Sequence, residues 1–144
     1  MQNFRICLFS FLLFAVLTVQ AQQEEVIKNY IETYRDIAIA EMHRTGIPAA
    51  IKLAQGIHET AAGTSDLVRR SNNHFGIKCK SNWNGESVKH TDDAPNECFR
   101  KYADPLDSYR DHSDFLKGIK RYASLFTLDP LDFSGWANGL KKAG

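Results

Sequence analysis

The sequence lacks the motifs that mark metal and nucleotide sites. Only three of the 144 residues are cysteine, and they form no C-x-x-C pair, which argues against the common zinc modules. No glycine-rich phosphate loop is present either. His58 and Glu59 resemble the start of the zinc-protease motif H-E-x-x-H, but Ala62 stands where the second histidine is required. We therefore expect no metal and no cofactor.

An excess of charge of either sign is also missing. The chain has 18 Lys and Arg against 17 Asp and Glu, for a net charge of +1. Binding to nucleic-acid phosphates depends on clustered Lys and Arg, so this balance argues against nucleic acid as the main partner. It is compatible with a neutral or mixed-charge substrate such as a polysaccharide.

The long apolar run of this chain is at its N-terminus. Residues 1–21 combine one basic residue, Arg5, with an apolar run over 6–19 and a small residue, Ala21, which is typical of a secretory signal peptide. A retained anchor is the alternative, although the run is short for a membrane span of about 20 residues. We expect a mature chain of 22–144, a monomer that is secreted or periplasmic and has no membrane span.

Cleavage of this segment would remove Cys7 and leave an even pair, Cys79 and Cys98. In a secreted protein an even pair favours a disulfide. Such a bond would stabilise the fold by roughly 3 kcal/mol on the chain-entropy model. Free thiols, or a zinc site that adds His74 and His90, are the competing interpretations, and the zinc spacing matches no common module.

Apolar periodicity predicts a chain that is mainly helical, with a small β-lobe inserted between two helices. Residues 71–102 interrupt the helical pattern, since they are rich in Asn, Gly, Asp and aromatic residues. Short strands and the turn Asn84-Gly85 suit that composition. The predicted helices cover 24–44, Pro48 to Gly63, a third that begins at Asp104-Pro105 and extends to Tyr122, and 133–142; the predicted strands cover 75–79, 87–91 and 97–102.

Glu59 is the one acidic residue of the stretch GIHETAAGTS and lies in the last turn of the second predicted helix. The helix dipole disfavours a carboxylate there by about 0.3–1 kcal/mol, which suits a proton donor better than a surface charge. Because the β-lobe follows directly, Glu59 is expected at the wall of a cleft between two lobes, a usual place for a substrate. The alternative is a charge that points into water.

Glycoside hydrolysis needs a carboxylic acid and usually a second carboxylate across the cleft. Glu59 suits the first role. Asp92 and Asp93, in the turn-rich part of the β-lobe, suit the second, and Glu86 and Glu97 are weaker candidates. The alternative for the Asp pair is a solvated turn.

Aromatic and amide side chains cluster in the same region. Aromatic rings stack on the apolar faces of sugars, and Asn side chains bind hydroxyl and acetamido groups. Phe75 and Phe99 are equally explained as core residues. The predicted substrate-binding residues are Asn72, Asn73, His74, Phe75, Trp83 and Tyr102.

Four stretches of the sequence resemble the bacterial glucosaminidase family of peptidoglycan hydrolases, glycoside hydrolase family 73. They are IKLAQGIHETAAGTSDLVRRSNNHFGIKCK, NWNGESVKHTDD, ECFRKY and SYRDHSDFL. The likeness covers roughly residues 47–144 and depends on AQ-x-x-x-E-[ST], NN-x-FGIK and FR-x-Y occurring in this order. It implies a lysozyme-like α+β fold, mainly helical, with a small β-lobe that flanks the cleft.

The resemblance also implies an activity and roles for particular residues. The substrate would be the glycan strands of peptidoglycan, cut at the β-1,4 bond after N-acetylglucosamine, with Glu59 as general acid. Asn73, Phe75 and Gly76 fall on the family's N-x-FG stretch at the cleft. Asp93 falls near the second carboxylate and Asp92 is its rival, while assistance by the substrate's acetamido group is a further route.

The chain departs from the family at two places. Thr60-Ala61-Ala62-Gly63 follows the glutamate where the family usually has a glycine- and tryptophan-containing segment, and family domains usually continue beyond the equivalent of Gly144 with a tyrosine that lines the site. The resemblance thus implies a domain shortened at its C-terminus. The alternative functions are a muramidase or lytic transglycosylase on the same fold, and a non-catalytic wall-binding module.

Overall fold

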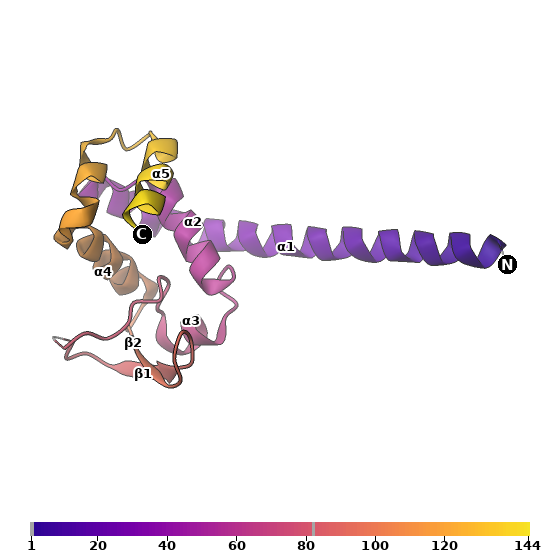
Figure 1. The fold of residues 1–144 in the computed structure, drawn as a ribbon, viewed down its shortest axis with the longest axis horizontal. Coiled ribbons are helices and arrows are strands. Elements are labelled where there is room, and N and C mark those ends of the chain that lie inside the picture. The colour runs from indigo at the N-terminus through magenta and orange to yellow at the C-terminus, as the bar shows by residue number, and fades with distance from the viewer. Residues whose placement is uncertain (1, 82) are drawn as a thin grey trace.

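A long first helix leads into a group of shorter helices and a small β hairpin (Figure 1). This computed structural model describes residues 2–81 and 83–144, with side chains from residue 20 onward. The predicted signal peptide lies almost wholly outside the residues whose side chains are described. The elements are α1 (Gln2–Thr45), α2 (Ala49–Thr60), α3 (Asp66–Ser71), β1 (Ser87–His90), β2 (Glu97–Arg100), α4 (Pro105–Gly118), the 3₁₀ helix η1 (Lys120–Thr127) and α5 (Phe133–Ala143).

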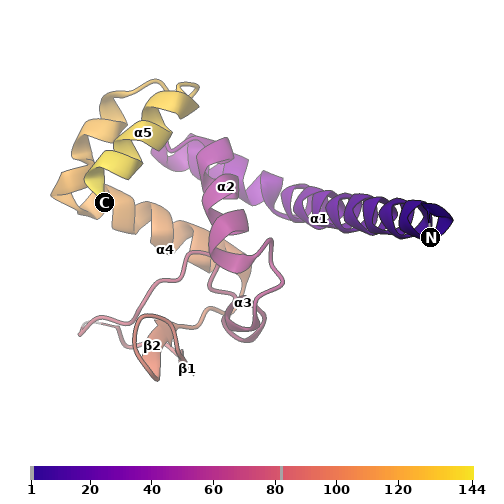
Figure 2. The ribbon, with the colours of Figure 1, turned by 45° about the vertical axis from the view of Figure 1, so that its right-hand side comes forward.

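The helical part of the molecule surrounds α2 with α1, α4 and α5, while α3 and the hairpin lie together at one end of it (Figures 1 and 2). The expectation of a mainly helical α+β fold with a small β-lobe is therefore confirmed. Among the described residues, no helix carries an apolar stretch long enough to cross a membrane.

Local sequence signals explain where several helices begin. Pro48 lies directly before α2, and Pro105 occupies the first turn of α4, where a missing backbone N–H is tolerated. Asp104 caps α4 by accepting a hydrogen bond from the Asp107 N–H at 3.2 Å. Helix α3 was not predicted, although Ser65 caps it by accepting from the Val68 N–H, which is a recognisable start signal.

Two hydrophobic clusters hold the elements together. The first joins α2, α4, η1 and α5 around Trp136, whose side chain is fully buried. The second joins α1, α4 and the residues after α3 around Tyr109, which is also fully buried. The buried members are Ile47, Ile51, Leu116, Tyr122, Leu125 and Trp136 in the first cluster, and Ala38, Phe75, Ile77 and Tyr109 in the second.

Two of the predicted helix ends differ from the structure. Helix α2 ends at Thr60 and not at Gly63, because Ala61 already adopts the left-handed conformation that closes the helix. Helix α4 ends at Gly118 and not at Tyr122, because Ile119 is extended and Tyr122 belongs to η1. Tyr122 still packs in the first cluster. Its place on an apolar face was therefore predicted correctly, whereas the helix to which it belongs was not.

The β-lobe contains two of the three predicted strands. β1 and β2 pair antiparallel, with Val88 opposite Phe99. The predicted strand 75–79 is wrong: it makes a single bridge, Lys78 with Phe99, because its first residues form a turn held by the side chain of Asn73.

Candidate active site

Glu59 lies in the last turn of α2 and its side chain is exposed. It faces the turn that contains Gly76. A Cβ built on Gly76 would lie 3.5 Å from the Glu59 Oε2, so the carboxylate and this backbone are in close proximity. Glu59 is thus accessible to a large substrate, and its environment is more open than the shielded pocket that the sequence suggested.

The backbone that follows Glu59 is strained. Ala61 and Ala62 have φ values of 49° and 52°, and Gly63 has 81°. The left-handed conformation costs a non-glycine residue about 1–2 kcal/mol. Thr60 stabilises the turn, since its Oγ1 accepts from the Gly63 N–H at 2.8 Å. Strain of this kind is concentrated at functional sites in proteins, which makes this helix end a candidate site.

The turn opposite Glu59 is built around the side chain of Asn73. Its Oδ1 accepts from the Ile77 N–H at 3.0 Å, and its Nδ2 donates to the Ile77 and Arg100 carbonyls, each at 2.9 Å. Gly76 has a φ of +59°, a conformation that favours glycine. The NN-x-FG stretch therefore presents a fixed backbone surface to the end of α2.

His74 is anchored from this turn into the helical body. Its Nδ1 is 2.8 Å from the Tyr30 hydroxyl, which is 3.2 Å from the Tyr109 hydroxyl. Burial lowers the pKa of His74 to about 4 and raises that of Tyr30 to about 12. The network is neutral at pH 7 and fixes the turn against α1 and α4.

Lys52 is an unexpected member of the same neighbourhood, because its side chain is fully buried. Its Nζ is 2.8 Å from the Tyr109 carbonyl, 2.9 Å from His112 Nδ1 and 3.0 Å from Ser113 Oγ. It also lies 4.3 Å from the centre of the Phe75 ring. Burial lowers the pKa of Lys52 to about 7, although Glu41 nearby opposes that shift. Sequence reasoning missed Lys52; its one signal was a cation on an otherwise apolar helix face.

The two candidate carboxylates of the β-lobe surround a lysine. Lys78 Nζ is 2.9 Å from Asp93, 2.9 Å from Glu97 and 3.4 Å from Asp92. The hydrogen bonds that Lys78 donates to Glu97 and Asp93 raise its pKa above the usual value. The three acids are close enough to hold a cation, but the Lys78 ammonium already contacts all of them. Asp92 and Asp93 are exposed, so either can meet a substrate.

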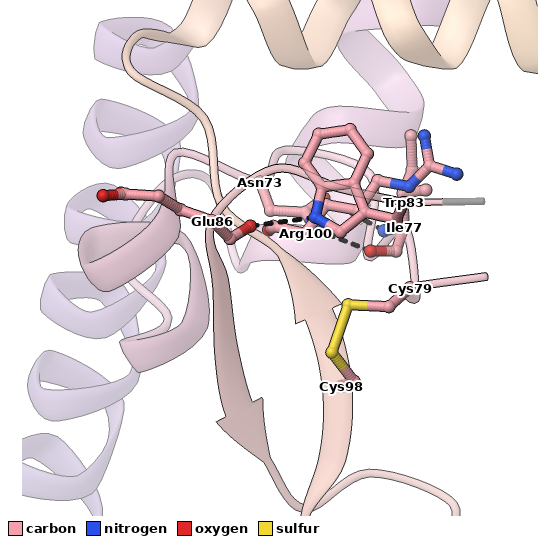
Figure 3. The surroundings of a disulfide bond; sticks show 7 residues. All are labelled: Asn73, Ile77, Cys79, Trp83, Glu86, Cys98 and Arg100. Atoms are coloured by element: carbon pink, nitrogen blue, oxygen red, sulfur yellow. Dashed lines mark hydrogen bonds between the residues drawn. A yellow bond between two sulfur atoms is a disulfide. The ribbon is translucent and has the colours of Figure 1, made fainter. Parts of the chain in front are cut away.

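A disulfide joins Cys79 to Cys98, as predicted, with a Cα–Cα distance of 5.3 Å (Figure 3). The two thiols are thus bonded to each other and cannot serve as the zinc ligands of the competing interpretation. The Cys79 N–H also donates to the Cys98 carbonyl at 2.8 Å. The bond attaches the segment after the Asn73 turn to strand β2.

The remaining predicted binding residues use their polar atoms within the protein. Asn72 Nδ2 donates to the Tyr102 and Ala103 carbonyls. The hydroxyl of the buried Tyr102 donates a hydrogen bond to Asp111, which also forms an ion pair with Arg100.

Trp83 is half-buried. Its Nε1 donates to the Glu86 carbonyl at 3.0 Å (Figure 3), and the Arg100 guanidinium lies 4.5 Å from the centre of its ring. His74 and Phe75 are buried as well. These side chains shape the site's surroundings, and Trp83 keeps a partly exposed ring.

Two hollows flank these elements. One, of about 530 Å³, lies between the first described side chains of α1 and the end of α2, where Ile57, Ala61 and Ala62 line it. The other, of about 370 Å³, lies between Trp83, Tyr102 and the outer face of α4. Glu59 lines neither of these two hollows.

The sequence profile of one family matches most of the chain. The family is described as mannosyl-glycoprotein endo-beta-N-acetylglucosaminidase, and the match covers residues 35–144. The chain belongs to the glucosaminidase family. It is therefore a glycoside hydrolase by family, and Glu59 and the Asn73 turn lie within the matched region. No curated protein sequence matches it significantly.

Solved structures support this membership of the glucosaminidase family. The glycoside hydrolase domain of Salmonella typhimurium FlgJ is 26% identical, with a TM-score of 0.70 over 82% of this chain and 76% of that one. A peptidoglycan hydrolase from Sphingomonas sp. A1 is 28% identical, with a TM-score of 0.69 over 81% and 76%. An N-acetylmuramoyl-L-alanine amidase from Staphylococcus aureus is 28% identical, with a TM-score of 0.60 over 69% of this chain and 31% of that one.

Proposed function

We propose that this glucosaminidase is secreted and hydrolyses peptidoglycan, at the β-1,4 bond after N-acetylglucosamine. Glu59 is the general acid that protonates the leaving oxygen. The observation that carries the proposal is the position of Glu59: an exposed carboxylate at a strained helix end, against the backbone of Gly76, inside the family match. The neighbours named as peptidoglycan hydrolases support the choice of substrate.

The openness of the site suits a polymer. An exposed acid between a helix end and a β-lobe can be reached by a glycan strand that extends beyond the site in both directions, whereas a closed pocket would admit only a chain end. The partly exposed ring of Trp83 offers an apolar face to a sugar further along the strand. These features support cleavage within the strand.

The second carboxylate is Asp93, with Asp92 as its alternative. Asp93 is more exposed than Asp92 and lies in a turn next to β2. Its ion pair with Lys78 orients the carboxylate, while the exposed turn lets it approach a bound sugar. A carboxylate in this role either activates water or stabilises the positive charge that develops on the sugar ring.

The test is the release of new reducing ends from purified peptidoglycan by the protein and by Glu59→Gln. The Gln side chain keeps the size of Glu but cannot donate the proton, so we expect a loss of at least about a hundredfold in rate. Glu32→Gln, an exposed acid on α1, is the matched control and should keep full activity.

Mass analysis of the products separates the candidate reactions. N-acetylglucosamine at the new reducing end supports the proposal. N-acetylmuramic acid there would indicate a muramidase, and an anhydro product a lytic transglycosylase. Equal activity of the protein and Glu59→Gln would remove Glu59 from the mechanism. Glycan binding without turnover by either would indicate a wall-binding module.

A further inference from the structure

Lys52 is fully buried, and each of its polar contacts lies on an element other than its own helix. The carbonyl of Tyr109, the ring of His112 and the hydroxyl of Ser113 all belong to α4. Three N–H groups meet three acceptors here when His112 carries its proton on Nε2, which satisfies the ammonium completely. The amine therefore fixes the position of α2 along α4.

The same amine also contacts the turn that faces Glu59. Lys52 Nζ is 4.3 Å from the centre of the Phe75 ring. The His112 ring also stacks on the Phe75 ring, with 4.0 Å between the ring centres and an interplanar angle of 3°. Gly76 follows Phe75 directly. A shift of the Phe75 ring would move the Gly76 backbone that lies against Glu59.

Lys52 and Glu59 also share one face of α2. They are seven residues apart, which is close to two helical turns, so movement of α2 about its axis displaces both together. The amine thus controls both partners of one contact: the helix that carries Glu59 and the turn that Glu59 faces.

We propose that Lys52 is a positioning residue for Glu59, holding α2 and the Phe75–Gly76 turn in register so that the carboxylate keeps its place beside Gly76. This inference rests on the proposed function for its kinetic consequence. Burial has the largest effect on this amine and lowers its pKa. Among the charged groups around it, Glu41 on α1 and Asp111 and Asp114 on α4 raise that pKa, and Arg44 on α1 lowers it.

The test replaces Lys52 by Met, which keeps the length and the contact with Phe75 and removes every hydrogen bond. Turnover number should fall roughly tenfold while KM stays within about twofold, because the acid is misplaced and the binding surface is not. Amide exchange at Ile77, whose N–H donates to Asn73 Oδ1, should become about tenfold faster, while exchange in α5 is unchanged. Exchange is measured without substrate and is therefore independent of the activity.

Leu125→Ala is the matched control, because Leu125 is 2% exposed and belongs to the other cluster, around Trp136. Both variants are assayed at a temperature where each is folded by circular dichroism. Equal losses of turnover and equal exchange at Ile77 in the two variants would overturn the inference, since Lys52 would then contribute stability alone.

A second variant covers the case in which Lys52→Met does not fold. Ser113→Ala removes one acceptor and leaves the amine in place, and it should produce the same changes in smaller measure. An unchanged exchange rate at Ile77 in Ser113→Ala would also overturn the inference. If the unaltered protein releases no reducing ends, the proposed function fails, while the exchange experiment still decides whether Lys52 positions the turn.

Discussion

The two sides of the candidate site are held in different ways. On the helical side, buried hydrogen bonds join Tyr30 of α1 to His74 of the turn, and Lys52 of α2 to the Tyr109 carbonyl of α4. On the β-lobe side, two four-residue strands, one disulfide and exposed ion pairs around Lys78 hold Asp92 and Asp93. Buried networks fix geometry, whereas exposed ion pairs contribute little stability. Glu59 is thus carried by a rigid helical part of the molecule, whereas Asp92 and Asp93 are carried by a β-lobe that can change its shape more easily.

The largest expected effect is a loss of stability in the β-lobe when its disulfide is removed. Replacing Cys79 and Cys98 together by Ser should cost about 3 kcal/mol in the stability of the β-lobe, because the bond closes a loop with a sequence separation of 19. Amide exchange in β1 and β2 should accelerate far more than in α4. Equal acceleration in both would mean that the lobe and the helices unfold as one unit, which would contradict the contrast drawn here.

Low pH should lower the stability of the helical side, because this side contains two buried histidines. The folded pKa of His74 is about 4, below its usual 6.5, and burial lowers that of His112 in the same direction. Below pH 6.5 the unfolded chain therefore binds protons that the folded chain refuses, and stability is lost as the pH falls towards 4. His74 alone should contribute roughly 2 kcal/mol of loss between pH 6.5 and 5.

Urea unfolding at several pH values measures this loss. His74→Asn should reduce the dependence between pH 6.5 and 5 and leave the part due to His112, whereas His58→Asn, at an exposed position of α2, should retain all of it. A dependence that His74→Asn leaves unchanged would place the titrating group elsewhere.

A smaller effect on stability is expected at two glycines with positive φ, and comparing them separates backbone strain from the contact between residue 76 and Glu59. Gly76→Ala and Gly46→Ala both place a side chain at positive φ, +59° and +82°, and each should cost about 1 kcal/mol. Only at Gly76 does the new methyl group meet Glu59, since nothing lies within 4 Å of it at Gly46. Hydrolysis should therefore fall about tenfold in Gly76→Ala alone. Equal activities of the two variants would show that the contact has no role in catalysis.

The smallest expected effect on stability is at the β-lobe acids. Asp93→Asn and Asp92→Asn each leave Lys78 with two of its three acidic neighbours, so thermal unfolding should hardly change. Activity should separate them, with the larger loss in Asp93→Asn. A larger loss in Asp92→Asn would exchange their roles, and no loss in either would favour assistance by the acetamido group of the substrate.

Much of the fold follows from local signals. The caps and prolines at Pro48 and Asp104-Pro105 mark the starts of α2 and α4, and the turn composition between them predicted β1 and β2. The disulfide followed from the even number of cysteines after residue 21. These features are readable because hydrogen bonds within a few residues, or the count of one residue type, decide them.

What the sequence by itself determined is therefore most of the elements, without α3 and η1, and the place of Glu59 at a helix end. The tertiary structure decided which residues surround that glutamate and hold it in place. The burial of the Lys52 amine was not predicted, because its hydrogen-bond acceptors on α4 are 57–61 residues away in the sequence. Residues 75–79 were predicted as a strand, because the local sequence does not reveal the hydrogen bond from Asn73 to the Arg100 carbonyl, 27 residues away, that helps to hold the turn. Such partners are distant in sequence, and the free energy of burying a polar group depends on whether they meet it.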